Sequence, residues 1–269
     1  NSRETIGMCA DKYRTSLRLA ETGIATPKTS LLQSIDTLQN TLDAVGETYP
    51  LILKTLRGSK GIGVIFIESR RQLDSIIQLL WKQDEDTELL LQKYIKSDHD
   101  VRVLVLGDKI FASMRRDVLK GDFRSNASLG AKVKMYNLSE LEIEHSILAG
   151  KSVGGLFTAV DFIPSSDPKN KPPFILEVNS SPGTEGIEKA NNKNIVKDIL
   201  VYFSNPNVRY TVPVECGWEE VVTVKPFGVL TGKFDTGNYK YPVLHAENVK
   251  IVGKKITFTT HDKTITTNL

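Results

Sequence analysis

A carboxylate and an amide interrupt an apolar stretch in the second half of the chain. In the segment FILEVN, Glu177 and Asn179 lie two positions apart, so a strand places them on one face. Leu176 and Val178 then occupy the opposite face. Asp161 lies in a second apolar segment, AVDFI, that can form a neighbouring strand. Oxygen ligands on adjacent strands suit a hard cation such as Mg²⁺, which takes few protein carboxylates together with substrate phosphates.

The alternative for these acidic residues is an ordinary solvated sheet face. A second feature bears on that choice. Lys54 ends an apolar strand directly before the segment GSKGIG, residues 58–63. Glycines let backbone N–H groups approach phosphate oxygens, and a nearby lysine neutralises phosphate charge. The loop has neither the G-K-[ST] of a Walker A motif nor the Rossmann pattern, and taken alone it is equally consistent with a plain turn.

The elements that must position these residues follow from hydrophobic periodicity. Residues 70–83 carry an apolar stripe of helical spacing, and Ser139 with Glu142 predicts a capping box at the start of another helix. Helices are predicted at 11–23, 36–47, 70–83, 138–154 and 193–203. Strands are predicted at 51–54, 64–67, 88–95, 101–107, 109–116, 156–163 and 174–179. The hairpins, including a turn at Gly107-Asp108, indicate an α+β fold with antiparallel sheets.

The character of the sequence changes near residues 205–212. Beyond this point short β-rich runs replace the helical patterns. We therefore predict a first domain at 1–205 and a small all-β module at 212–269.

Composition excludes several classes of protein. The 269 residues carry a net charge of +3, too mild by itself to indicate a nucleic-acid binder. Cys9 and Cys216 lie far apart, which argues against a disulfide scaffold or a zinc site and favours a reducing, cytoplasmic location. An apolar run of about 20 residues is lacking, so a membrane-spanning role is not expected. The chain begins with Asn, as a processed product, a fragment or part of a longer protein would.

Several segments, read in order, carry a family resemblance. The segments are ADKYRTSLRLAETGIATPKT, PLILKTLRGSKGIGV, LLLQKYIKSDHDVRVLVLGDKIFASMRR, KGDFRSN and LEVNSSPGTEGIEK. Over about residues 5–203 they closely resemble the RimK branch of the ATP-grasp ligases. The resemblance implies the ATP-grasp fold, in which two α+β subdomains grip ATP between antiparallel sheets. Here a small all-β C-terminal module follows that fold.

The resemblance also implies a nucleotide site. Two lysines would reach the ATP phosphates, a glycine loop would close over them, and a hinge backbone would hold the adenine edge. A ribose-contacting acid and the RSN segment would complete the site. The implied nucleotide-binding residues are Lys12, Lys54, Gly58, Ser59, Gly61, Gly63, Lys93, Tyr94, Asp100, Arg124, Ser125 and Asn126. Lys93 replaces the acidic residue usual in the family, which matters little where the contact is through the backbone.

By the same resemblance, Asp161, Glu177 and Asn179 match the metal ligands. Two Mg²⁺ ions are expected, with Mn²⁺ as an alternative. The implied catalytic residues are Arg124, Asn126 and Arg115. Arg102, Arg115 and Arg116 could together hold an acidic substrate, or be surface charges at strand ends.

The implied activity is that of an ATP-dependent carboxylate–amine ligase working through an acyl phosphate. Glutamate is the expected amino acid, and the C-terminus of a peptide or protein is the expected acceptor. The sequence does not choose among acceptors, and it leaves a homo-oligomer open. Family members normally have an α/β domain before the helix that carries Lys12, and almost nothing precedes that helix here.

The tail suggests a further activity. Asp235-Thr236-Gly237 matches the aspartic protease signature, and its context resembles a retropepsin-like domain, although one lobe supplies only one aspartate. Two alternatives to the ligase therefore stay open. One is an ATP-binding module without turnover, and the other is a protease regulated by ATP.

Overall fold

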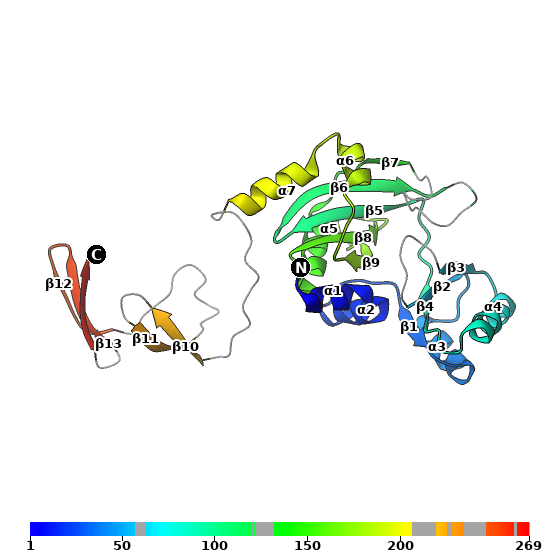
Figure 1. Cartoon of the computed structure of the whole chain (residues 1–269), viewed down its shortest axis with the longest axis horizontal. Coiled ribbons are helices and arrows are strands. Elements are labelled where there is room, and N and C mark those ends of the chain that lie inside the picture. The colour runs from blue at the N-terminus through cyan, green and yellow to red at the C-terminus, as the bar shows by residue number, and fades with distance from the viewer. Residues whose placement is uncertain are drawn as a thin grey trace. The chain divides into compact units, whose positions relative to one another are not determined.

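Two antiparallel sheets organise Asn1–Val212, the first of two units into which the chain divides in this computed structural model. The second unit is Pro213–Leu269. The structure describes residues 1–56, 63–119, 121, 132–205, 219–224, 228–233, 246–260 and 263–268. Figure 1 shows helices around the sheets of the first unit.

The smaller sheet of the first unit has the strand order β1-β4-β2-β3. Its strands are β1 (Thr29–Leu32), β2 (Leu51–Thr55), β3 (Val64–Ile67) and β4 (Leu89–Lys93). The short 3-10 helix η1 (Ile35–Thr37) leads into α3 (Leu38–Val45), and α4 (Arg70–Gln83) follows β3. The predicted helix at 70–83 is confirmed with the same bounds. Its stripe buries Leu73 and Ile77 completely in the core of this half.

The larger sheet has the strand order β7-β6-β5-β8-β9. Its strands are β5 (His99–Leu106), β6 (Lys109–Asp117), β7 (Val133–Met135), β8 (Phe157–Ile163) and β9 (Phe174–Asn179). The predicted turn at Gly107-Asp108 joins β5 to β6. Gly107 has a φ of +63°, a conformation that glycine adopts without steric cost.

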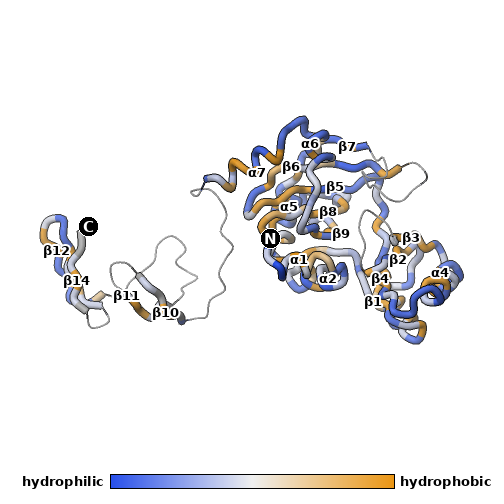
Figure 2. Tube along the Cα trace, in the orientation of Figure 1, coloured by the Kyte–Doolittle hydropathy of each residue, from blue (hydrophilic) through white to orange (hydrophobic). Residues whose placement is uncertain are grey.

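Helices cover both faces of the larger sheet. They are α1 (Arg3–Ala10), α2 (Lys12–Glu21), α5 (Glu140–Ser152), α6 (Glu185–Asn191) and α7 (Ile195–Ser204). Residues of α2 and α5 share one core cluster with the sheet, and residues of α6 and α7 share another. The capping box of α5 is confirmed, since Ser139 N–H donates to Glu142 Oε2 at 2.8 Å and Glu142 N–H donates to Ser139 Oγ at 3.3 Å. Figure 2 shows hydrophilic and hydrophobic segments alternating along α4 and α7.

A β-bulge interrupts the pairing of β8 with β9. Phe162 lies opposite Ile175, and Asp161 lies opposite Glu177, so Leu176 is an extra residue on β9. Ile175 packs in the core with Phe162, whereas Leu176 is half-buried. The prediction of simple alternation is therefore wrong at Leu176, because the bulge separates a core-facing part of the strand from the part that carries Glu177.

The second unit is described through five strands in two sheets. They are β10 (Glu219–Val224), β11 (Gly228–Lys233), β12 (Glu247–Val252), β13 (Lys255–Thr260) and β14 (Lys263–Asn268). Leu230 and Phe258 are its buried apolar side chains among the residues described. Asp235 and the two residues after it lie outside the described part. None of the described helices is long and apolar enough to cross a membrane.

Candidate functional site

Three predicted ligands meet at the paired ends of β8 and β9. Asp161 lies directly opposite Glu177, and Asn179 lies two residues further along the same strand. The side-chain amide of Asn179 donates through Nδ2 to Glu177 Oε1 at 3.0 Å. Glu177 keeps 41% of its side chain exposed, while that of Asp161 is 4% exposed. The sheet thus presents one open carboxylate, one buried carboxylate and one amide on a single face.

Two arginines hold the buried carboxylate. Arg102 donates to Asp161 through Nε to Oδ1 at 2.7 Å and through Nη2 to Oδ2 at 2.6 Å. Arg116 donates through Nη2 to Asp161 Oδ2 at 2.9 Å. The same arginine makes a second bidentate pair with Asp100, at 2.6 and 2.7 Å. Charge-assisted pairs of this geometry are the strong hydrogen bonds of proteins.

These contacts set the protonation of Asp161. Burial alone would raise the pKa of its carboxyl, but Arg102 and Arg116 outweigh burial and hold the pKa below its usual value of 3.8. The carboxylate is therefore ionised wherever the protein is folded at neutral pH. Its attraction raises the pKa of Arg116 in turn, against the opposing effect of burial.

Two lysines approach the same face from other elements. Lys12 opens α2 and donates through Nζ to the carbonyl of Leu56 at 3.3 Å. Burial lowers the pKa of Lys12 and of Lys54, and the carboxylate of Glu177 acts against burial at both. Lys12 additionally lowers the pKa of Lys54. The two predicted phosphate-binding lysines are therefore close enough to Glu177, a predicted metal ligand, to interact with it electrostatically.

A hydrogen-bond relay holds Lys54. Its Nζ donates to Gln92 Oε1 at 2.7 Å, and Gln92 Nε2 donates to Thr29 Oγ1 at 2.7 Å. The Thr29 hydroxyl donates in turn to the carbonyl of Pro27 at 2.9 Å. Because the Lys54 ammonium can only donate, Gln92 must turn its carbonyl oxygen toward Lys54 and its amide nitrogen toward Thr29.

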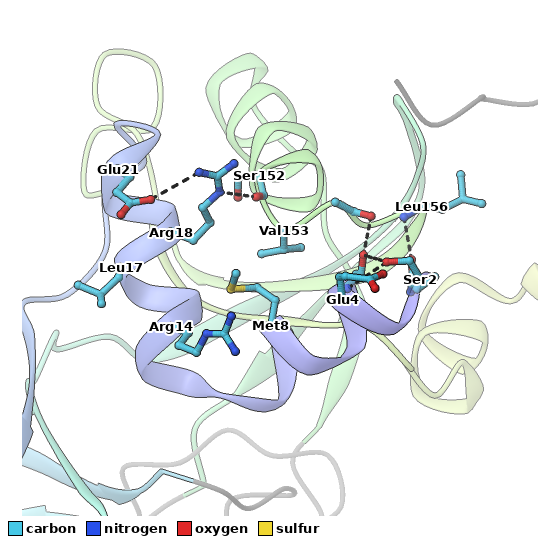
Figure 3. Close-up of a pocket in the computed structure, with 13 residues that line it drawn as sticks. Ser2, Glu4, Met8, Arg14, Leu17, Arg18, Glu21, Ser152, Val153 and Leu156 are labelled. Carbon is cyan, nitrogen blue, oxygen red and sulfur yellow. Dashed lines mark hydrogen bonds and ion pairs between the residues drawn. The ribbon is translucent and has the colours of Figure 1, made fainter. Parts of the chain in front are cut away.

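A cavity of about 230 Å³ opens beside the metal-ligand face. Lys12, Glu177 and Asn179 line it. Cys9, Ser180 and Ser181 line it as well, and burial raises the pKa of the Cys9 thiol to about 11. A larger pocket of about 630 Å³ lies elsewhere, and Figure 3 shows its walls.

The larger pocket is formed by α1, α2 and the segment that follows α5. In Figure 3, Arg18 reaches across it from α2 and donates through Nε to the carbonyl of Ser152 at 2.9 Å. Arg18 also pairs with Glu21 at 3.5 Å. Its lining includes none of the residues predicted to bind nucleotide or metal.

Other predicted residues have different placements. Asp100, the predicted ribose contact, is 7% exposed, and both of its oxygens accept from Arg116 in a buried ion pair. Arg115 alternates with Arg116 along β6 and therefore lies on the opposite face of the sheet, where it pairs with Asp98 and Asp117. The structure does not bring Arg115 to the cavity.

The predicted adenine hinge lies at the end of β4. The backbone N–H of Lys93 donates to the carbonyl of Lys28 at 2.9 Å, so a nucleotide contact there falls to its carbonyl or to Tyr94. The ring of Tyr94 packs edge-on against Phe66, with centroids 5.0 Å apart. Gly63 has a φ of +78° and its carbonyl accepts from Thr55 N–H at 3.0 Å.

Six predicted residues lie outside the described part of the chain: Gly58, Ser59, Gly61, Arg124, Ser125 and Asn126. Within that part, no group of three or more His, Cys, Asp or Glu side chains is placed to hold a metal. The cluster at β8 and β9 combines two carboxylates with an amide. Mg²⁺ sites that are completed by substrate phosphates need no more.

From the sequence, Arg102 and Arg116 could hold an acidic substrate or be surface charges at strand ends, and they were not paired with aspartates. A signal was available. Asp100 and Arg102 share one face of β5 because they are two residues apart, and Arg116 lies directly opposite Asp100 on β6. Opposite charges in such positions predict cross-strand ion pairs once the strand pairing is known.

Comparisons with known proteins agree with this geometry. The sequence profile of the RimK-like ATP-grasp domain matches residues 9–203. A protein of Coxiella burnetii named probable alpha-L-glutamate ligase is 36% identical over 204 residues, which cover 75% of this chain and 65% of the relative. A protein of the same name from Cellvibrio japonicus is 37% identical over 199 residues, covering 73% of this chain and 64% of that protein. The chain thus spans just under two thirds of the length of these relatives.

Solved structures show the same fold. The D-alanine–D-alanine ligase of Bacillus anthracis complexed with ATP superposes with a TM-score of 0.56 at 22% identity, over 70% of this chain and 62% of that one. The ATP-grasp ligase PsnB, complexed with a minimal precursor, Mg and ADP, gives a TM-score of 0.57 at 20% identity, over 75% and 60%. The first unit has the ATP-grasp fold, and the chain belongs to the RimK-like ATP-grasp family.

Proposed function

We propose that the first unit binds ATP with Mg²⁺ and uses it to join a carboxylate to an amine. The amino acid added is glutamate, and the acceptor is the C-terminal carboxylate of a peptide or protein. The observation that carries the proposal is the approach of Lys12 and Lys54 to the carboxylate of Glu177, in a chain of this family. The names of the relatives support glutamate as the amino acid.

The residues present fit a magnesium ion. Glu177 supplies an exposed carboxylate, Asn179 a carbonyl oxygen whose amide nitrogen is already engaged, and Asp161 a carboxylate that stays ionised. Bound there with the nucleotide, Mg²⁺ would offset negative charge on the phosphate oxygens. One ion or two, and Mg²⁺ or Mn²⁺, fit this ligand set.

The proposed reaction has two balanced steps. An oxygen of the acceptor carboxylate forms a bond to the γ-phosphorus of ATP, the bond from that phosphorus to the bridging oxygen breaks, and ADP leaves. The amine of glutamate then bonds to the acyl carbon and loses a proton as phosphate departs. Lys12 and Lys54 contribute positive charge where the phosphates lie, and electrostatic stabilisation of this kind is the main source of catalysis in phosphoryl transfer.

The predicted residues Arg124 and Asn126 remain part of the proposal as groups that approach the phosphates, beside Ser125 and the loop of Gly58, Ser59, Gly61 and Gly63. Support for them comes from the sequence motif alone. Adenine is proposed to lie against the backbone at Lys93 and Tyr94. A cytoplasmic location is proposed from the cysteine usage of the chain.

The test is a ligation assay. The protein is incubated with ATP, Mg²⁺, glutamate and candidate acceptor peptides, and both phosphate release and the mass of the peptides are followed. Glu177→Gln removes the open carboxylate at constant shape and is expected to abolish ligation. Glu144→Gln, an exposed position on α5, is the matched control and should retain it. Activity equal to wild type in Glu177→Gln would contradict the proposed site.

An ATP-binding module without turnover is the alternative reading of the same site. It predicts nucleotide binding by calorimetry together with no acceptor-dependent phosphate release and no added glutamyl mass. For the second unit, a retropepsin-like module is proposed from Asp235-Thr236-Gly237 alone. Cleavage of a casein substrate that survives Asp235→Asn would refute that role.

A further inference from the structure

The face that carries the proposed cation ligands has no excess of negative charge. Its anions are Asp100, Asp161 and Glu177, and its cations are Lys12, Lys54, Arg102 and Arg116. Among the described residues, the three negative charges of these carboxylates are thus outnumbered by four positive charges. Asp11, which also attracts Lys12, brings the balance to zero when it is counted.

The two arginines also occupy most of the binding capacity of Asp161. A carboxylate offers about four lone-pair positions. Arg102 takes one on each oxygen and Arg116 takes a second on Oδ2, so the contacts among the described residues leave one position, on Oδ1. The buried carboxylate can therefore supply a single further bond.

Glu177 is the more open carboxylate, but it also has positive neighbours. Its Oε1 accepts from Asn179 and lies 3.9 Å from Arg102 Nη2. Lys12 lines the same cavity as Glu177, and Lys54 interacts with Glu177 electrostatically. A bare divalent cation entering here would meet three positive groups around one exposed carboxylate.

Divalent cations that bind to protein alone require several carboxylates whose charge is not already neutralised. A nucleoside triphosphate has the opposite requirement, because Lys12 and Lys54 attract its phosphates, and its own oxygens then supply the missing ligands and negative charge. The face is therefore arranged for an anion first and for a cation only together with that anion.

We propose that Arg102 keeps the divalent cation from binding at this site in the absence of the nucleotide. The inference rests on the proposed nucleotide function and deepens it. Arg102 is the responsible residue because it neutralises Asp161 and lies beside Glu177 as well. Arg116 is fixed between Asp100 and Asp161 with 5% of its side chain exposed, whereas Arg102 is 21% exposed at the edge of the site.

The test uses the full chain and Mn²⁺ as the probe, with protein-bound Mn²⁺ measured by equilibrium dialysis, because AMPPNP itself complexes Mn²⁺ and lowers the free ion without protein. Wild-type protein is expected to bind Mn²⁺ alone at least about tenfold more weakly than in the presence of the non-hydrolysable analogue AMPPNP. Arg102→Met removes one positive charge and is expected to tighten binding of Mn²⁺ alone by about tenfold or more. Arg102→Lys keeps the charge and should behave as wild type.

Arg115→Met is the matched control, because it removes the same charge from the opposite face of the sheet. It should leave the affinity for Mn²⁺ alone unchanged. Circular dichroism of each variant verifies the fold before binding is measured. Wild-type binding of Mn²⁺ alone that equals binding with AMPPNP overturns the inference, as does an affinity of Arg102→Met for Mn²⁺ alone that equals wild type.

Failure of the proposed function has a different signature. In that case AMPPNP does not bind with or without Mn²⁺, by calorimetry. The measurement with AMPPNP would then contradict the inference. The comparison of Arg102→Met with Arg115→Met would still report whether Arg102 weakens the binding of Mn²⁺ alone.

Discussion

Replacing Arg116 by methionine tests the physical account of the ion-pair network without any assay of activity. The guanidinium makes three charge-assisted hydrogen bonds, two to Asp100 and one to Asp161. The side chains of Asp100 and Asp161 are 10% and 4% exposed. Removing the guanidinium from such a buried network deprives two buried carboxylates of a charged partner, at a cost of about 3–5 kcal/mol.

Arg115→Met is the matched control on the same strand. Its partners Asp98 and Asp117 are 76% and 32% exposed, so solvent screens these pairs. Exposed ion pairs contribute about 0–1 kcal/mol. The two variants remove the same group from neighbouring positions, but the carboxylates left behind are exposed beside Arg115 and buried beside Arg116.

The measurement is hydrogen–deuterium exchange of peptides that cover β5 and β6, read by mass spectrometry at pH 7. A loss of about 3–5 kcal/mol in opening free energy speeds exchange by roughly two to three and a half orders of magnitude in Arg116→Met. Arg115→Met should change exchange less than about tenfold. Equal effects of the two variants, or less than tenfold in Arg116→Met, would refute the reasoning.

The pH dependence of the network has a definite sign. Because the pKa of Asp161 is depressed in the folded state, its contribution to stability is present above the unfolded value near 4 and is lost as the pH falls through the folded pKa. Arg116→Met removes part of that depression. The stability difference between wild type and variant is therefore expected to narrow as the pH is lowered below about 4.

Three further outcomes are expected. Gln92→Leu leaves Lys54 without its side-chain acceptor and should weaken binding of AMPPNP by about tenfold in calorimetry; an unchanged affinity would show that the relay is dispensable. Alkylation of Cys9 by iodoacetamide should be slow at pH 8 and accelerate toward pH 11, as followed by peptide mass; a rate already maximal at pH 8 contradicts its raised pKa. Gly63→Ala should lower the free energy of unfolding by about 1–3 kcal/mol and with it the urea midpoint, since its Cβ would lie 2.5 Å from Thr55 Oγ1 at a φ of +78°. A wild-type midpoint in that variant would contradict the placement.

Long periodic segments were predictable from the sequence because their burial follows one rule along their length. The stripe at 70–83 predicted α4, and the alternation around Glu177 placed that residue and Asn179 on one strand face. The meeting with Asp161 followed from assigning two neighbouring strands. In each case the chemistry of the side chain and the geometry of the element point to the same answer.

Short elements without a clear stripe were not predicted. Helix α1 buries Thr5 alone among its residues, and β1 buries only Leu32, so neither has an apolar pattern to detect. In α2 the apolar Leu17 is 46% exposed while Thr15 is buried, which reverses the usual preference. Hydrogen bonding explains the reversal, since the hydroxyl of Thr15 donates to the carbonyl of Met8 at 2.7 Å.

The ion-pair partners required knowledge of strand pairing. Arg102 faces Asp161 across β5 and β8, and Asp100 faces Arg116 across β5 and β6. Periodicity within one strand identifies which residues share a face but not which strand lies beside it. The sequence alone therefore could not distinguish arginines that bind substrate from arginines that neutralise a buried carboxylate of the protein.

The bulge at Leu176 bears on how relatives of this chain should be aligned. Ile175 faces the core and Glu177 faces the cavity although two positions separate them, because Leu176 adds no step to the pairing. A homologue lacking one residue here would form a regular strand and would still present its glutamate beside Asp161. A gap at this point of an alignment is thus compatible with an intact ligand set, whereas a gap between Glu177 and Asn179 would turn one of the two toward the wrong side.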